Sequence, residues 1–110
     1  MIALGCDQAG YDLKQEVIKY LEDKKIPYKD YGCYSTDPVD YPIYARKVGK
    51  AIQDGECEKG ILICGTGIGI SIAAYKMKGI RAALCTDCFC AEATRQHNDG
   101  NILAMGGTVV

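Results

Sequence analysis

The sequence has no excess of charge of either sign and no long apolar run. Its 13 Lys and Arg side chains nearly balance 14 Asp and Glu side chains, which leaves a formal net charge of −1. This balance gives no electrostatic reason to expect a nucleic acid or an anionic membrane as a partner. No apolar stretch approaches the roughly 20 residues that a helix needs to span a bilayer. We therefore expect no nucleic-acid partner and no membrane association.

The sequence also shows neither the pattern of a secretory leader nor that of a disulfide framework. The opening residues, MIALGCDQAG, do not place a basic stretch before an apolar one, as a signal sequence would. The cysteines are seven, an odd number, and without an export signal they are typical of free thiols in a reducing compartment. We therefore expect a cytoplasmic protein.

The chain offers few side chains for a metal site, and its one histidine is His97. Cys85, Cys88 and Cys90 have the spacing of half a zinc site, but no second CxxC and no pair of histidines accompanies them. We therefore expect these cysteines to pack within a helix or strand, and we expect no metal.

Short apolar runs alternate with amphipathic stretches over the whole chain, which predicts one domain, residues 1–110. Strands are predicted at 1–6, 26–32, 60–64, 79–85 and 101–105. Helices are predicted at 11–25, 43–56, about 67–77 and 87–97. This order predicts an α/β fold in which helices flank a five-stranded parallel sheet.

Ligands of parallel sheets bind beyond the carboxyl ends of the strands. The segments at those ends here are 7–10, 33–42, 64–67 and 86–87. After the fifth strand the chain reads only GGTVV, with no closing helix. We therefore expect one face or edge of the sheet to be poorly covered, either for a partner subunit or for a further segment.

The segment 61–71, ILICGTGIGIS, carries glycines at alternate positions directly after a predicted strand. The dinucleotide fingerprint is G-x-G-x-x-G, whereas this loop is G-x-G-x-G and follows the third strand. A Walker loop requires Lys and then Ser or Thr after its last glycine, and Ile70 and Ser71 stand there. A cysteine-phosphatase cradle would place an arginine where Ile70 stands. None of these three motifs fits.

The loop can still bind an anion. Backbone N–H groups of Gly65, Thr66 and Gly67 can point into one concavity, which suits a phosphate, a carboxylate or a reaction oxyanion. Cys64 stands at its entrance, where a helix N-terminus favours the thiolate. A buried strand cysteine beside a tight turn explains the same pattern, and both interpretations stay open.

Two further side chains are candidates for the site. Asp7 follows the first strand directly and can meet Cys64 across adjacent strand ends. His97 ends the last predicted helix, on the opposite edge of the sheet, where a capping or surface role explains it equally well.

Five segments together resemble type B ribose-5-phosphate isomerase, of the sugar-phosphate isomerase family that includes allose- and galactose-6-phosphate isomerases. They are GCDQAGYDLK, STDPVDYPIYA, GILICGTGIGISIAA, KGIRAALC and TRQHNDGNILAMGG. The resemblance implies a Rossmann-like three-layer α/β/α sandwich that acts as a homodimer or homotetramer without a cofactor. It implies interconversion of ribose 5-phosphate and ribulose 5-phosphate through a cis-enediolate, in the pentose phosphate pathway. A 6-phosphohexose substrate, a non-catalytic sugar-phosphate-binding module and a phosphocysteine carrier remain alternatives.

The resemblance also implies roles for individual residues. Cys64 matches the base that moves a proton between C1 and C2, and His97 matches the residue that helps to open the furanose ring. Because the family's site lies between subunits, His97 would serve a neighbouring chain. The remaining positions match the loop that holds the enediolate oxygen (Gly65, Thr66, Gly67, Ile68 and Gly69) and the contacts to the substrate (Asp7, Gln8 and Asn98).

Three features depart from the family's pattern. Gln8 stands where the family usually has histidine, and Tyr75 stands where it usually has asparagine. The family also continues into a C-terminal helix whose arginines bind the substrate phosphate, and this segment is not in the 110 residues. The residues that bind the phosphate are therefore left unassigned.

Overall fold

Five parallel strands form one sheet in the computed structural model, which describes residues 1–109. The strands are β1 (Ile2–Cys6), β2 (Tyr28–Asp30), β3 (Lys59–Cys64), β4 (Ala82–Leu84) and β5 (Ile102–Gly106). Their order across the sheet is β2-β1-β3-β5-β4, and every neighbouring pair is parallel. The predicted sheet is therefore confirmed, with β3 at its centre.

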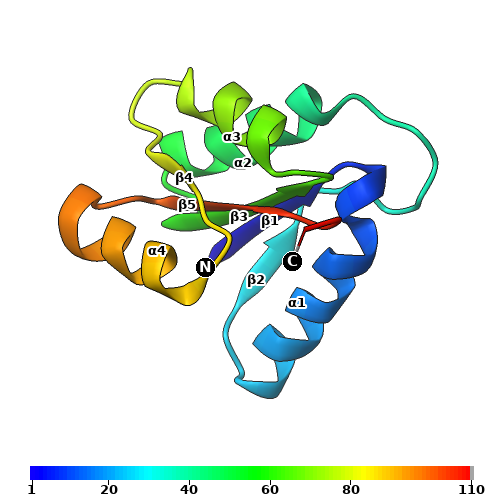
Figure 1. Cartoon of the computed structure of the whole chain (residues 1–110), viewed down its shortest axis with the longest axis horizontal. Helices are drawn as coiled ribbons and strands as arrows, with labels where there is room; N and C mark the ends of the chain where they lie inside the picture. The colour runs from blue at the N-terminus through cyan, green and yellow to red at the C-terminus, as the bar shows by residue number, and fades with distance from the viewer. Residues whose placement is uncertain (110) are drawn as a thin grey trace.

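Helices lie on both faces of this sheet. Figure 1 shows α2 (Tyr41–Gln53) and α3 (Ile68–Tyr75) above the sheet, with α1 (Tyr11–Asp23) and α4 (Cys88–Ala93) below it. This arrangement confirms the three-layer α/β/α sandwich.

All four helices differ from the predicted boundaries, and the differences are largest at α2 and α4. The helix α2 begins at Tyr41 rather than at residue 43, so that Pro42 lies in its first turn. A proline is tolerated there because the N–H groups of a first helical turn have no partner within the helix. The helix predicted at 87–97 is instead α4 followed by a π-helical turn, η2 (Thr94–Asn98). A short 3-10 turn, η1 (Gln8–Gly10), also precedes α1.

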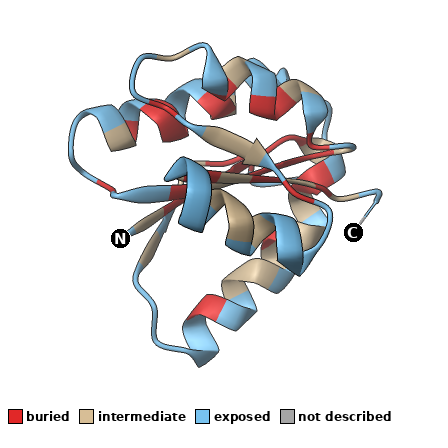
Figure 2. Cartoon of the chain, turned by 60° about the vertical axis from the view of Figure 1, so that its left-hand side comes forward, coloured by how far each residue is buried: buried red, intermediate tan, exposed pale blue. Residues whose placement is uncertain are grey.

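The main core lies between the sheet and the layer of α2 and α3. Leu62 of β3, Val48 of α2 and Ile70 of α3 are all fully buried in it, and Figure 2 shows the buried positions on the strands and on the inward turns of the helices. Side chains alternate along a strand, so Leu62 and Cys64 point to this face while Ile63 points toward α1. Cys64 therefore faces the layer that carries α3.

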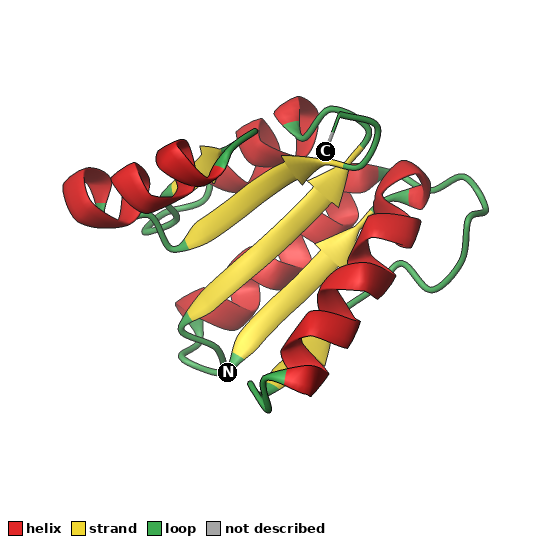
Figure 3. Ribbon diagram, turned by 60° about the horizontal axis from the view of Figure 1, so that its bottom comes forward, coloured by secondary structure: helices red, strands yellow, loops and turns green. Residues whose placement is uncertain are grey.

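The opposite face of the sheet is covered less completely, as expected. Leu13 and Val17 of α1 pack beside Ile63 on one side of it. Between α1 and α4, the part of the chain that the structure describes places no helix over the strands (Figure 3). A groove of about 210 Å³ opens there, and its lining includes Ile61 and Leu103.

Three further properties bear on function. No helix within residues 1–109 is long and apolar enough to cross a membrane. In the same residues, no three His, Cys, Asp or Glu side chains are grouped as metal ligands. All of the cysteines are free thiols.

Candidate active site

Cys64 is the last residue of β3, at the middle of the carboxyl edge of the sheet. Its side chain is 5% exposed, and in register it lies beside Gly106 of β5. Its sulfur accepts a hydrogen bond from the N–H of Gly67 at 3.2 Å. The chain therefore turns back over the thiol immediately after the strand ends and places the first turn of α3 next to it.

This return depends on Gly67, which precedes α3. Its φ is 81°, in the left-handed region that L side chains rarely adopt. A Cβ at this position would also lie 2.7 Å from the carbonyl carbon of Met105 in β5. The loop is held against the end of β5 by hydrogen bonds from Gly107 N–H to the Cys64 carbonyl and from Thr108 N–H to the Gly65 carbonyl, at 2.7 and 2.9 Å.

Two backbone donors of this loop have no acceptor among the described residues. Among residues 1–109, the N–H groups of Gly65 and Thr66 have no backbone or side-chain acceptor. The N–H of Ile68 is engaged with the Thr66 hydroxyl at 3.1 Å. Ile68 and Gly69 form the first turn of α3, where the positive end of the helix dipole lies. The N–H of Gly67, which the sequence predicted to face the anion, is instead engaged with the Cys64 sulfur.

Asp7 and Gln8 lie at the same edge, directly after β1. Asp7 donates its N–H to the Ile63 carbonyl at 3.1 Å, so it continues the register of β1 beside Cys64. Its carboxylate accepts the N–H of Gly10 at 3.1 Å, which caps η1, and its side chain is buried. The side-chain oxygen of Gln8 accepts the N–H of Val39 at 3.0 Å and ties the 33–40 loop to this edge.

His97 and Asn98 do not join these residues within one chain. Both lie in η2, before β5 begins, whereas Cys64 lies at the level where β5 ends. The four steps from Ile102 to Gly106 separate these levels by about 13 Å at 3.3 Å per residue. Figure 1 shows the segment between α4 and β5 (orange) at the edge of the molecule opposite to the glycine loop. The predicted separation of His97 from the strand ends is therefore confirmed.

Tyr41 is a neighbour of the loop that the sequence analysis did not assign. A Cβ on Gly69 would lie 2.7 Å from the Tyr41 hydroxyl oxygen, so the phenol ring rests directly on this glycine. Both residues line an open cavity of about 400 Å³ between α2 and α3, together with Arg46 and Lys76. The last glycine of the motif therefore makes room for Tyr41, and only the packing of α2 on α3 reveals this contact.

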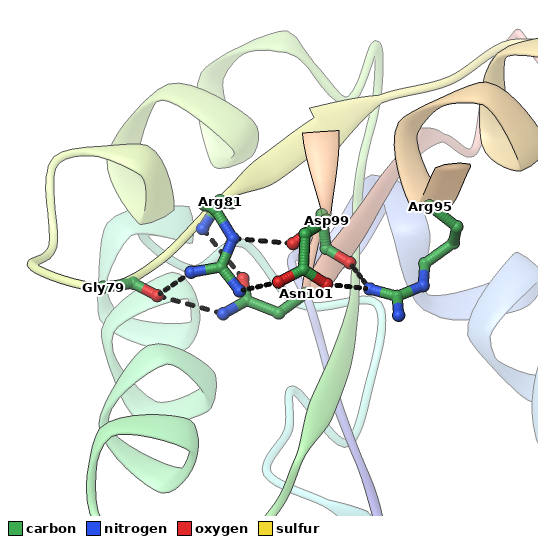
Figure 4. A network of polar contacts seen from close by, with 6 residues as sticks. Gly79, Arg81, Arg95, Asp99 and Asn101 are labelled. Carbon is green, nitrogen blue, oxygen red and sulfur yellow. Dashed lines mark hydrogen bonds and ion pairs between the residues drawn. The ribbon is translucent and has the colours of Figure 1, made fainter. Parts of the chain in front are cut away.

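The two arginines nearest to His97 are engaged with other groups. Arg81 and Arg95 both pair with the carboxylate of Asp99, at 3.3 and 3.2 Å (Figure 4).

Tyr75, at the end of α3, is 66% exposed and points away from the core. It is free to contact a partner.

The cysteines at 85, 88 and 90 lie at and just before the start of α4. Burial raises the pKa of Cys85, and a hydrogen bond with Asp87 raises the pKa of Cys90. The carboxylate of Asp87 accepts the N–H of Cys90 at 2.8 Å and caps α4, and this bond lowers the pKa of Asp87. The expectation that these cysteines pack within a helix or strand is confirmed for Cys85, which is buried, and is wrong for Cys88 and Cys90, which are exposed on α4.

A thiol at the centre of a parallel sheet, facing a glycine loop with free N–H donors, is typical of an enzyme that stabilises an oxyanion. Comparison with known proteins identifies the class more closely. The model of the Ribose/Galactose Isomerase family matches residues 2–110. The chain belongs to this family.

Relatives of known name and structure agree with this assignment. The chain is 50% identical over 109 residues to ribose-5-phosphate isomerase B of Escherichia coli, covering 99% of this chain and 73% of that protein. It is 46% identical to ribose-5-P isomerase B of Listeria innocua, over 99% of this chain and 74% of that protein.

The solved ribose-5-phosphate isomerase B of Clostridium thermocellum superposes with a TM-score of 0.98 at 50% identity, over 99% of this chain and 74% of that one. The solved ribose 5-phosphate isomerase of Thermotoga maritima superposes with a TM-score of 0.97 at 48% identity, over 99% of this chain and 75% of that one. The predicted family and fold are thereby confirmed.

Proposed function

We propose that this chain is an aldose–ketose isomerase that interconverts ribose 5-phosphate and ribulose 5-phosphate through a cis-enediolate, with Cys64 as the base. The observation that carries this proposal is the position of the Cys64 sulfur, 3.2 Å from the Gly67 nitrogen and beside the free N–H groups of Gly65 and Thr66. A base and an oxyanion site are therefore adjacent, as proton abstraction next to a carbonyl requires.

In the aldose-to-ketose direction, the Cys64 thiolate removes the proton from C2 of the open-chain sugar. The electron pair of that C–H bond forms the C1–C2 double bond, and the carbonyl pair moves to O1. The N–H groups of the loop stabilise the developing charge on that oxygen. The thiol then returns the proton to C1 while the proton on O2 passes to O1, which leaves a carbonyl at C2. No electron leaves the substrate, so the chemistry requires no redox cofactor.

The neighbouring side chains hold the substrate in this scheme. Asp7, buried beside Cys64, and Gln8, at the start of the 33–40 loop, face the sugar hydroxyls. The names of the relatives in E. coli and L. innocua support a five-carbon substrate over a 6-phosphohexose. We place the enzyme in the cytoplasm, because its free thiols suit a reducing compartment.

The complete site is proposed to form between two copies of the chain. Cys64 and His97 lie at opposite ends of the parallel strands, and this separation supports a site that is shared between two copies. Ile68, Ile72 and Tyr75 of α3, with Leu84 of β4, form an exposed apolar surface next to the loop, which we name the α3 patch; the four are 50%, 52%, 66% and 39% exposed. Clustered apolar side chains of this size support a protein partner at this surface. A second copy that packs there can bring its own His97 and Asn98 to Cys64.

A turnover assay tests the chemistry. The wild-type protein should convert ribose 5-phosphate to ribulose 5-phosphate, and Cys64→Ala should lose at least about a thousandfold in kcat if the thiolate is the base. Cys88→Ala is the matched control, because this thiol is exposed on α4, and it should keep wild-type activity. Full activity in Cys64→Ala would remove the assigned base.

A mixing experiment tests the shared site. Cys64→Ala alone is expected to be almost inactive, and His97→Ala alone to keep only a small, measurable fraction of the wild-type activity. After the two proteins are unfolded and refolded together, half of the dimers should be mixed, and one of their two sites contains both intact residues. Activity should then return to about a quarter of the wild-type value if the partners exchange statistically. No recovery, with mixed dimers demonstrated by native mass spectrometry, would place the whole site within one chain.

A further inference from the structure

The turn that carries His97 and Asn98 is fixed at its end by Asp99. The N–H groups of Asp99 and Gly100 both donate to the Thr94 carbonyl, which closes the π-helical turn η2. Asp99 itself has a φ of 49°, in the left-handed region. Such a conformation is unfavourable for a residue with a side chain, although Asp tolerates it better than most. The direction of His97 and Asn98 therefore depends on contacts that hold Asp99 in place.

Arg81, at the start of β4, provides those contacts. Its Nε donates to the Asp99 carbonyl at 2.6 Å, and its terminal nitrogens reach the Asp99 carboxylate at 3.3 Å and the Gly79 carbonyl at 3.2 Å (Figure 4). The side chain of Asn101 holds the main chain on either side of this contact: its oxygen accepts the main-chain N–H of Arg81 at 2.8 Å, and its nitrogen donates to the Gly79 carbonyl at 3.0 Å. One planar guanidinium thus binds both the main chain and the side chain of Asp99.

These contacts are too exposed to serve mainly the stability of the fold. The side chains of Arg81 and Asp99 are 46% and 74% exposed, and exposed ion pairs contribute little to the stability of a fold. Arg95 adds a second contact to the Asp99 carboxylate at 3.2 Å, from within η2 itself. Three charged side chains therefore hold one exposed turn in place. This turn, η2, carries His97 and Asn98, the two proposed substrate contacts.

We infer that Arg81 and Asp99 are positioning residues that aim His97 and Asn98 at the sugar. This inference rests on the proposed function, because it assigns a purpose to the orientation of His97. A group that assists ring opening must stay within hydrogen-bond reach of the ring, and a misplacement of about 1 Å can lower the rate by about a hundredfold. Arg81 acts through His97 and Asn98, because its guanidinium is engaged with Asp99 and Gly79.

The test combines a double-mutant cycle with hydrogen exchange in the full chain. Arg81→Gln and Asp99→Asn should each lower kcat/KM for ribose 5-phosphate by about tenfold or more. In a His97→Ala, Asn98→Ala background, the same Arg81→Gln change should lower it by less than about threefold, because residues that act as a unit are not additive. In Arg81→Gln, the amides of Asp99 and Gly100 should exchange at least about tenfold faster, with an unchanged melting temperature.

The control is a second exposed ion pair, between Lys50 of α2 and Asp54, which follows this helix directly, at 3.3 Å. Lys50→Gln should leave turnover and exchange at 97–100 unchanged. An equal loss of activity from Arg81→Gln in both backgrounds, or unchanged amide exchange in that variant, would overturn the inference and leave the isomerase proposal intact. Absence of turnover by the wild-type protein would overturn the proposed function first, before any variant is compared.

Discussion

Replacement of Gly67 by alanine tests the geometry of the loop most directly. The added methyl group would lie 2.6 Å from Leu84 Cδ1 and 2.7 and 2.9 Å from the carbonyl carbon and oxygen of Met105. The Leu84 side chain can move aside, because it is 39% exposed, but the Met105 backbone belongs to β5 and cannot. The φ of 81° is an independent penalty for any residue with a Cβ.

The expected loss of stability in Gly67→Ala is the sum of the backbone penalty and the overpacking penalty. A left-handed backbone costs alanine about 1–2 kcal/mol, and an overpacked site costs about 1–3 kcal/mol. Gly67→Ala should therefore lower the free energy of unfolding by about 2–5 kcal/mol, a large part of the 5–15 kcal/mol typical of a domain. For a chain of this length, this corresponds to a fall in Tm of about 8–20 °C. Thermal and urea denaturation at a fixed protein concentration would measure it.

Gly65→Ala is the matched control, two residues earlier in the same loop. A Cβ at Gly65 meets only Ala9 and Thr108, at the ordinary contact distances of 3.6 and 3.7 Å, and its φ lies outside the left-handed region. Its free energy of unfolding should change by less than about 1 kcal/mol. Equal effects of the two substitutions, or a Gly67→Ala protein as stable as the wild type, would refute this account of the turn over Cys64.

Two further predictions concern buried groups near the same edge. Lys14 is 1% exposed and donates to Asp30 at 2.7 Å and to the Cys33 carbonyl, so Lys14→Met should lower the free energy of unfolding by about 3 kcal/mol, because one charge stays behind without its partner. A loss below about 1 kcal/mol in urea would contradict it. Burial raises the pKa of Cys6 to about 12, so between pH 9 and 12 the unfolded chain binds fewer protons at this thiol than the folded one. The stabilisation from the neutral thiol is therefore complete below about pH 9 and is lost as the pH rises toward 12. Denaturation midpoints between about pH 8 and 10.5 should fall more steeply for the wild type than for Cys6→Ala, and parallel slopes would contradict the assignment.

The alternation of strands and helices was readable from the sequence because hydrophobic periodicity is local. Each buried run of four to six residues, and each stripe at helical spacing, reports its own environment without reference to distant segments. The grouping of the site residues followed from the topology, because the carboxyl ends of parallel strands lie at one edge of the sheet. Cys64, the glycine loop and Asp7 each follow or end a strand, so the sequence predicted that they lie together. The resemblance supplied the family, and the comparisons confirm it.

Only the tertiary structure decided which contacts these residues make. The hydrogen bond from Gly67 to the Cys64 sulfur, the ring of Tyr41 over Gly69 and the hold of Arg81 on Asp99 each join side chains or turns whose approach depends on how helices pack on the sheet. No local pattern encodes such an approach, because it is set by the register of β3 against β5 and by the packing of α2 on α3. The sequence by itself determined the order of the elements and the edge where the chemistry lies, and packing between distant elements determined the geometry of the site.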